Sequence, residues 1–201
     1  MSAARRASLL AVKAMAFTVM AFAALLADAR PAIAHAPAAT GWWWIGNQSP
    51  RPLPEVAALR PETPDGGLYV AGNPAGEEAV SALRFQVLPS VTDARLELRA
   101  AGSSGTPGLQ ACRVTSAWSP AVGGRWEERP AYDCSTAVRA AASEDGRTFS
   151  FEVGPLVAGP VFDVVITAAP TDPAGRPPLF QVAFEAPDSR SLSTSAASEA
   201  A

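Results

Sequence analysis

Apolar and polar side chains alternate residue by residue in short stretches of this 201-residue chain. Every second residue is apolar in residues 81–87 and 94–99. The first stretch places Leu83, Phe85 and Val87 on one side of the backbone. Successive side chains of a β-strand point to opposite faces, so this period of two predicts strands with one buried face. Similar stretches, some less regular, lie at residues 67–70, 109–114, 148–153, 161–167 and 180–184.

The strand-like stretches are separated by turns rich in glycine and proline. Residues 137–142 are the one helix-like patch after the leader, and they are too few to form a stable helix alone. The connection at residues 89–93 is short and typical of a hairpin. Many short antiparallel strands build sandwiches or barrels, and the alternation argues against a parallel sheet. We therefore predict an all-β fold, a single jelly-roll-like β-sandwich.

Residues 1–34 have the order of a secretory signal peptide. Arg5, Arg6 and Lys13 come first, an uncharged apolar run follows at residues 14–27, and Ala-Ile-Ala stands at residues 32–34. Positive, apolar and then small residues mark a cleavable leader. The run has 14 residues, whereas a helix that spans a bilayer needs about 20. We expect export to the outside or the cell surface, with no membrane span after cleavage.

The remaining chain divides into three segments. Residues 35–66 contain several prolines and three consecutive tryptophans, and are expected to be irregular. Residues 67–186 carry the strand pattern and form the predicted β-sandwich. Residues 187–201 turn to Ser, Ala, Asp and Glu, a composition typical of a disordered tail.

The charge of the mature chain argues against nucleic acid as a partner. Without its first 34 residues the chain keeps 12 Arg and no Lys against 18 Asp and Glu, a formal net charge of −6. Proteins that bind DNA or RNA need a basic face to displace counterions from phosphate. This chain offers no such face.

Two cysteines, Cys112 and Cys134, both follow the leader. An even number of cysteines in an exported chain predicts a disulfide. For a loop of this length, the loop-entropy model gives about 3 kcal/mol of stabilisation. Two free buried thiols are the alternative, and a metal site is disfavoured because no His lies near either cysteine.

The patterns of common catalytic sites do not occur in the sequence. The one histidine, His35, lies far from any serine of the nucleophile-elbow type, and neither G-x-S-x-G nor H-E-x-x-H is found. Cleavage after Ala34 would give His35 a free amino group that can chelate copper, but no second His supplies another ligand. We expect no enzyme activity, no cofactor and no metal site. A structural calcium stays open without named ligands, because no D-x-D-x-D-G loop is present.

Tryptophan is the candidate contact residue. Indole faces stack on sugar rings, and burial is the usual alternative. Side chains alternate along a strand, so Trp42 and Trp44 share one face and Trp43 takes the other, which predicts that at least one is exposed. Trp118 and Trp126 lie between the two cysteines, where burial remains the alternative. We take Trp43, Trp126 and Trp118 as tentative ligand-binding residues.

A succession of short motifs resembles a known family. GLYV at residues 67–70, SALRF at 81–85 and ARLEL at 94–98 are followed by the tryptophans at 118 and 126. Over residues 67–185 this order is similar to the DNRLRE-type, carbohydrate-binding-module-like β-sandwich domains of exported bacterial proteins, and to a group of exported actinobacterial proteins. The family's signature tetrad is not evident. The resemblance implies a jelly-roll-like fold and a glycan-contacting or adhesive role rather than a reaction.

Two function classes remain open. One is a non-catalytic module that binds polysaccharide of the cell envelope or the extracellular space. The other is a structural or protein-interaction component of the cell surface with no small-molecule ligand. A row of exposed aromatic side chains favours the first, and an apolar patch or an open edge strand favours the second.

The leader predicts where the mature chain begins. N-terminal sequencing of exported protein should start at or near His35, because the small residues at 32–34 end the signal pattern. An intact Met1 on the exported protein would contradict this.

Overall fold

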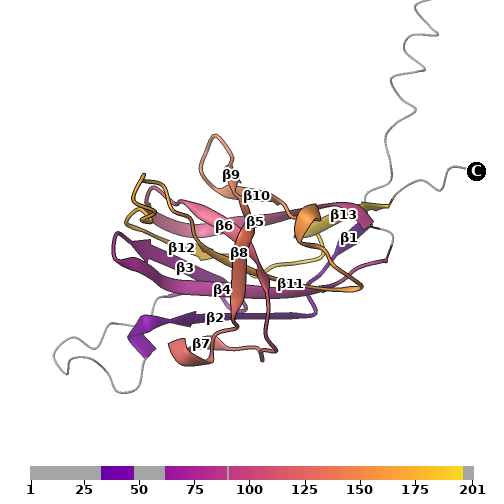
Figure 1. Ribbon diagram of the computed structural model, residues 1–201, viewed down its shortest axis with the longest axis horizontal. Coiled ribbons are helices and arrows are strands. Elements are labelled where there is room, and N and C mark those ends of the chain that lie inside the picture. Colours follow the sequence, from indigo (N-terminus) through magenta and orange to yellow (C-terminus); the bar gives the residue numbers. More distant parts are fainter. Residues whose placement is uncertain (1–32, 48–61, 90, 197–201) are drawn as a thin grey trace, which may run out of the picture. The chain divides into compact units, whose positions relative to one another are not determined.

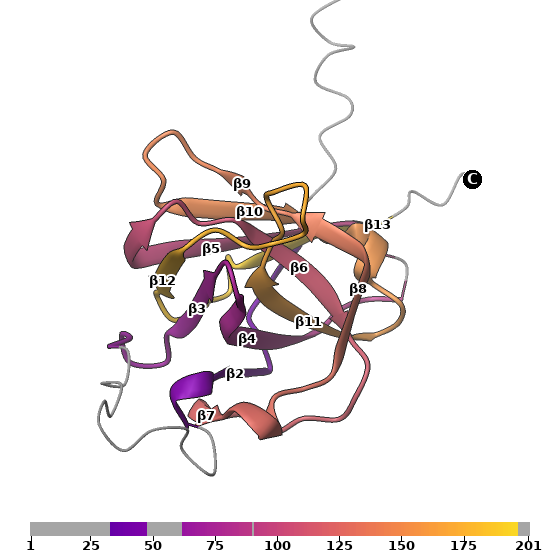
Figure 2. The same cartoon turned by 60° about the vertical axis from the view of Figure 1, so that its left-hand side comes forward.

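The computed structural model describes residues 33–47, 62–89 and 91–196, which form an all-β domain (Figures 1 and 2). Its strands are β1 (Ile33–His35), β2 (Ala39–Trp44), β3 (Leu68–Asn73), β4 (Gly76–Gln86), β5 (Val91–Gly105), β6 (Leu109–Val114), β7 (Val122–Arg125), β8 (Tyr132–Arg139), β9 (Ala141–Ala142), β10 (Thr148–Glu152), β11 (Val161–Ala168), β12 (Phe180–Phe184) and β13 (Leu192–Ala196). One-turn 3₁₀ helices occupy Ile45–Asn47, Trp126–Glu128 and Gly154–Leu156. The predicted all-β class is confirmed, and residues 1–32 of the predicted leader lie outside the described residues.

Two long strands change partners along their length and so curl the sheet into a sandwich-like domain. β4 pairs with β3 at its start, with β11 over its second half and with β2 over its centre. The first part of β5 pairs with β10 and β13, and its last part with β12. The strand pairs are antiparallel except β2–β7, which is parallel. Figure 2 shows the resulting layers on either side of the core.

The core between the layers is filled by the apolar sides of the alternating strands. Leu83 and Phe85 of β4 are 0% exposed, as is Leu96 of β5. Burying one such side chain contributes about 1.5–3 kcal/mol. Other members of this core include Leu68, Val70, Leu98, Phe149, Phe151, Phe162, Val164, Ile166, Phe180, Val182, Phe184 and Leu192.

β4 and β11 are buried on their second face as well. Val80 and Ala82 of β4 and Val165 of β11 pack against Trp43 and Trp118. Trp43 comes from β2, and Trp118 comes from the segment that joins β6 to β8. The sequence pattern predicted strands with one buried face, and these two strands are covered on both.

Residues 137–142, the helix-like patch expected to be too short for a stable helix, end β8 and form β9, where they pair with β6 and β10. One local prediction is wrong. The connection at residues 89–93 is not a hairpin. Within the described residues β4 and β5 make no backbone pairs with each other, and their apolar faces meet across the core instead.

Both ends of the domain contain strands that the sequence did not predict. β2 lies within residues 35–66, which were expected to be irregular, and pairs with β4. β13 lies within residues 187–201, which were expected to be a disordered tail, and pairs with β5 and β1. Its Leu192 is 0% and its Thr194 2% exposed, so burial of alternate residues outweighs the polar composition.

The first strand spans the predicted cleavage point. In β1, Ile33 pairs with Thr194 and Ala34 pairs with Ser193. The Nε2 atom of His35 lies 2.9 Å from the hydroxyl of Thr194. Cleavage after Ala34 would therefore remove two of the three residues of β1 and leave the His35 contact in place.

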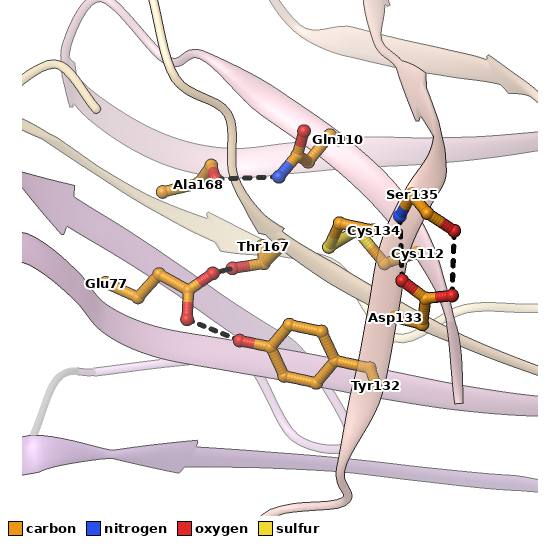
Figure 3. Close-up of a disulfide and its surroundings, with 9 residues drawn as sticks. All are labelled: Glu77, Gln110, Cys112, Tyr132, Asp133, Cys134, Ser135, Thr167 and Ala168. Carbon is orange, nitrogen blue, oxygen red and sulfur yellow. Dashed lines mark hydrogen bonds between the residues drawn. A yellow bond between two sulfur atoms is a disulfide. The ribbon is translucent and has the colours of Figure 1, made fainter. Parts of the chain in front are cut away.

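Cys112 and Cys134 form the predicted disulfide, with their Cα atoms 4.7 Å apart (Figure 3). It joins β6 to β8 at a shift in their register. Ala111 is paired with Val138, whereas Arg113, two residues later, is paired with Asp133. β8 therefore has extra residues opposite Cys112, and the covalent bond connects the strands where backbone pairing is interrupted. The bond also closes the segment that carries Trp118 and Trp126.

Removing this bond should destabilise the domain. The Cys112→Ala, Cys134→Ala double variant should lose about 3 kcal/mol of unfolding free energy, measured by chemical denaturation against the oxidised parent. Thiol titration of the native, unreduced protein should detect no free thiol. Two titratable thiols, or a double variant as stable as the parent, would contradict the assignment.

Candidate functional site

Two of the three tentative ligand-binding tryptophans are buried. Trp43 is 1% exposed and Trp118 is 8% exposed. Their rings meet edge to face with the centroids 5.8 Å apart. Neither presents an indole face to solvent, so the expectation that Trp43 is an exposed platform is wrong.

The alternation within β2 is as predicted, but both of its faces are covered. Trp43 packs into the cluster on β4 and β11, while Trp42 is 0% exposed and lies 5.6 Å from the ring of Tyr69. Trp44, on the same side as Trp42, is half-buried. The fit around Trp43 requires Gly124, because a Cβ atom there would lie 2.4 Å from Cδ1 of the indole.

Trp118 is held by an ion pair on the outer face of β4 and β11. Arg84 Nε donates to Asp163 Oδ1 at 2.8 Å and its Nη2 donates to Oδ2 at 3.3 Å. Trp118 Nε1 donates to the same Oδ1 at 3.2 Å, and the guanidinium carbon of Arg84 lies 4.9 Å from the ring centroid. A charge-assisted pair and a satisfied indole N–H make Trp118 part of the fold.

Trp126 is half-buried, and one side of its ring is occupied. The guanidinium carbon of Arg129 lies 4.1 Å from the ring centroid, and Arg129 Nη1 donates to the Trp126 carbonyl at 2.9 Å. The ring also packs beside the cluster of Trp43 and Trp118. A sugar that stacked on the Arg129 side of this indole would have to displace the guanidinium.

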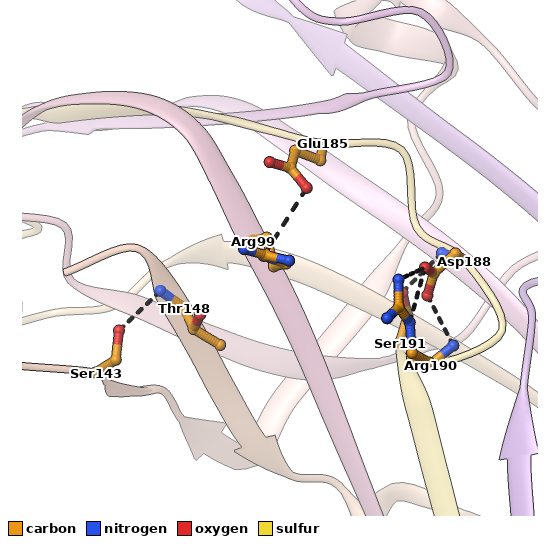
Figure 4. Close-up of polar contacts among 7 residues, drawn as sticks. All are labelled: Arg99, Ser143, Thr148, Glu185, Asp188, Arg190 and Ser191. Atoms are coloured by element: carbon orange, nitrogen blue, oxygen red, sulfur yellow. Dashed lines mark hydrogen bonds and ion pairs between the residues drawn. The ribbon is translucent and has the colours of Figure 1, made fainter. Parts of the chain in front are cut away.

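A cleft of about 310 Å³ lies between β5, β10 and the loop that joins β12 to β13. Many of its polar groups bond one another (Figure 4). Asp188 accepts hydrogen bonds from the backbone N–H of Arg190 at 2.7 Å and from Nη2 of Arg190 at 3.0 Å. These bonds hold the pKa of Asp188 below its usual value. Ser191 Oγ accepts from the Asp188 N–H at 2.9 Å, and Arg99 Nε lies 3.9 Å from Glu185 Oε2. A ligand here would compete with these contacts.

A second concavity, of about 350 Å³, lies on the outer face of β3, β12 and β5, strands that Figure 1 labels. We call it the serine hollow, and it is lined by Glu62, Tyr69, Gly102, Ser103, Ser104, Gln181 and Ala183. Strand register places Ala183 between Tyr69 and Gly102. A Cβ atom at Gly102 would meet nothing within 4 Å. Small residues thus open a depression in the sheet face.

Tyr69 forms the floor of the serine hollow and orients Gln181. Ser81 Oγ accepts the Tyr69 N–H at 3.1 Å and donates to the Tyr69 carbonyl at 2.8 Å, which fixes the backbone near where β3 leaves β4. The Tyr69 hydroxyl donates to Gln181 Oε1 at 2.7 Å. Burial, and then the charge of Glu78, raise the pKa of Tyr69 to about 12. The phenol therefore stays a donor, and the amide nitrogen of Gln181 is left to donate elsewhere.

Two polar groups of the serine hollow have no partner among the described residues. They are the hydroxyl of Ser104 and the amide nitrogen of Gln181, which are register partners on β5 and β12 and are both exposed. Ser103 is the register partner of the core residue Val182, so its side chain points to the other face of the sheet. Hydroxyls donate and accept, and an amide N–H₂ donates twice. The hollow thus presents several hydrogen-bonding groups to a polar ligand, whereas many of those in the cleft at Asp188 are already paired.

A third polar cluster lies beside the disulfide (Figure 3). The carboxylate of Glu77 in β4 accepts hydrogen bonds from the hydroxyls of Tyr132 in β8 and Thr167 in β11. Burial, and then the charge and hydrogen bond of Glu77, raise the pKa of Tyr132. The two hydroxyls and the carboxylate are hydrogen-bonded to one another and connect β4, β8 and β11, so the cluster stabilises the fold.

No family model, curated protein or solved structure matches the chain. The part of the chain that the structure describes contains no group of three or more His, Cys, Asp and Glu side chains that could hold a metal ion. Over the same residues, no helix has both the length and the apolar character to cross a membrane. The family resemblance in the motifs therefore stays a prediction, and the geometry of the surface carries the functional argument.

Sequence reasoning missed the residues of the serine hollow. The Gly-Ser-Ser-Gly run at residues 102–105 looks like a turn, yet it continues β5 and pairs with β12. Gln181 stands at an outward position of a predicted strand, which usually means ordinary surface. Only the register that places Gln181 beside Ser104, and Ala183 beside Gly102, shows that these residues form one depression.

Both tyrosines of the chain, Tyr69 and Tyr132, should resist ionisation. Because folding raises both pKa values above 10, this contribution to stability is complete below pH 10 and is lost as pH rises towards 12 and beyond. Absorbance at 295 nm should show no phenolate step near pH 10 in the folded protein and two equivalents there in denaturant. A folded-state step at pH 10 would contradict the burial of either phenol.

Proposed function

We propose that this chain is an exported, non-catalytic β-sandwich domain that binds polysaccharide in the serine hollow. The observation that carries the proposal is the pair of unpartnered groups on Ser104 and Gln181 beside a depression floored by an aromatic ring. The cysteine pair is compatible with an oxidising, extracellular location. The leader supports the same compartment.

The binding mode follows from the geometry of Tyr69 and Gln181. Since the phenol holds Gln181 Oε1, the amide nitrogen is oriented before a ligand arrives and donates to a sugar hydroxyl. The hydroxyl of Ser104, on the same face as Gln181, accepts or donates as the sugar requires. Gly102 carries no side chain, so a sugar ring can approach the backbone of β5 at that point.

One such site binds weakly. A hydrogen bond that replaces one to water contributes about 0.5–1.5 kcal/mol net, and the hollow offers only a few. Repeated sugar units on one polymer, or several domains on one surface, raise the apparent affinity through effective concentration. This fits a module that adheres to a polymer better than one that captures a free sugar.

The test is isothermal titration of the mature domain against peptidoglycan fragments, arabinogalactan-type polymers and common plant glycans. At least one should bind, and Gln181→Ala should weaken that binding between about twofold and tenfold by removing one oriented donor. Gln86→Ala is the matched control, since Gln86 is exposed on β4 and does not line the hollow. It should leave the affinity unchanged.

Two results would overturn the proposal. One is silence across the whole panel with folded protein, and the other is a glycan whose affinity is indifferent to Gln181→Ala. If Trp126→Ala weakens binding of a glycan and Gln181→Ala does not, the binding site lies at Trp126, as the sequence suggested, and not in the serine hollow.

One observation favours a second candidate function, a protein-interaction component of the cell surface. Residues 102–105 of β5 pair with β12 on one edge, and on the other edge the described residues supply no backbone partner. These four residues are small, uncharged and exposed, so no charged side chain protects this edge from pairing with another chain. Concentration-dependent self-association of the mature domain without any glycan would support this candidate, and a monomer over the whole accessible range would remove it.

A further inference from the structure

We infer that the serine hollow prefers glycans bearing free amino groups over neutral glycans, and that it disfavours uronate-bearing ones. This inference rests on the proposed function, because it names the ligand class for the same hollow. It comes from the charges around the depression rather than from the hydroxyl and amide groups that carry the binding itself.

The charged side chain that lines the hollow is acidic. Among its lining residues Glu62 is charged, and Arg and Lys are absent from that set. Glu62 is exposed, and in the described structure it forms no ion pair. A carboxylate in this setting is available to pair with a cation on a ligand.

A second carboxylate acts on the residue that floors the hollow. Glu78 of β4 accepts a hydrogen bond from Asn73 Nδ2, and after burial its negative charge is the second cause of the raised pKa of Tyr69. Asn73 is neutral, so this bond leaves the negative charge of Glu78 uncompensated. The hollow therefore lies in the field of two carboxylates.

The contrast with the cleft at Asp188 shows that this charge pattern is local. That cleft is lined by Arg99 and Arg190 as well as by acids, so an anionic ligand would meet cations there. Among the described lining residues of the serine hollow, the charged group that a uronate would meet is the carboxylate of Glu62. A protonated amine on the sugar replaces that repulsion with attraction.

The expected preference is modest because the hollow is open to solvent. Exposed charge pairs contribute little, and salt screens them. At low salt, an oligosaccharide with free amines should bind about threefold tighter than its fully N-acetylated counterpart of the same length. Raising the salt to 1 M should remove most of that difference, because the screening length falls to about 3 Å.

The experiment titrates the mature domain with length-matched chito-oligosaccharides, one set N-acetylated and one deacetylated, and with oligogalacturonate, at low and high salt. Glu62→Gln should reduce the preference for the amine, because it leaves only the charge of Glu78, and should retain binding of the N-acetylated oligomer. Glu144→Gln, an exposed glutamate in a turn away from the hollow, is the matched control and should keep the preference.

The outcomes separate this inference from the proposed function. Amine, acetyl and uronate oligomers binding equally, or a preference undiminished by Glu62→Gln, would overturn the inference while the hollow remains a glycan site. Binding of the uronate in preference to the amine would overturn it as well. Absence of binding by these oligomers and by the wider glycan panel would overturn the proposed function itself.

Discussion

Burial of both faces of β4 is the constraint on which the rest of the structure depends. Leu83 and Phe85 face the core between the layers, while Val80 and Ala82 face outward and are equally buried. A strand of this kind must pack against other residues on both faces. Its own sequence does not specify which residues those are. The core supplies one cover, and Trp43 with Trp118 supplies the other. The disulfide closes the segment that carries Trp118.

The packing of the tryptophans argues against them as ligand-binding residues. Removing a buried tryptophan side chain from a core costs about 3–5 kcal/mol, a large share of the 5–15 kcal/mol that stabilises an ordinary domain. Trp43 and Trp118 therefore act in folding, and Trp126 is covered on one side by Arg129. The proposed ligand surface is the outer face of β3, β12 and β5, where small residues, a hydroxyl and an amide line the hollow in place of indole.

The sequence predicts those features of the fold that are determined within one short stretch of the chain, and it misses those that depend on residues far apart. The strands around Leu83, Leu96 and Phe149 follow from a period of two, and the disulfide follows from two cysteines in a chain with a predicted export leader. β2 escaped prediction because both of its faces are buried, so no alternation marks it. Exposure of Trp43 was predicted wrongly because the cover comes from a segment some 75 residues further along the chain. The serine hollow depends on cross-strand register, which no single stretch of sequence reveals.

The central claim is that the tryptophans are structural and leave ligand contact to the polar sheet face. Brief hydroxyl-radical footprinting of the native protein, read residue by residue with tandem mass spectrometry, tests it without any ligand. The account predicts slow oxidation of Trp42, Trp43 and Trp118, which are buried, and faster oxidation of the half-buried Trp44 and Trp126. All five should react alike after unfolding. Oxidation of Trp43 in the native protein as fast as that of Trp126 would contradict the account.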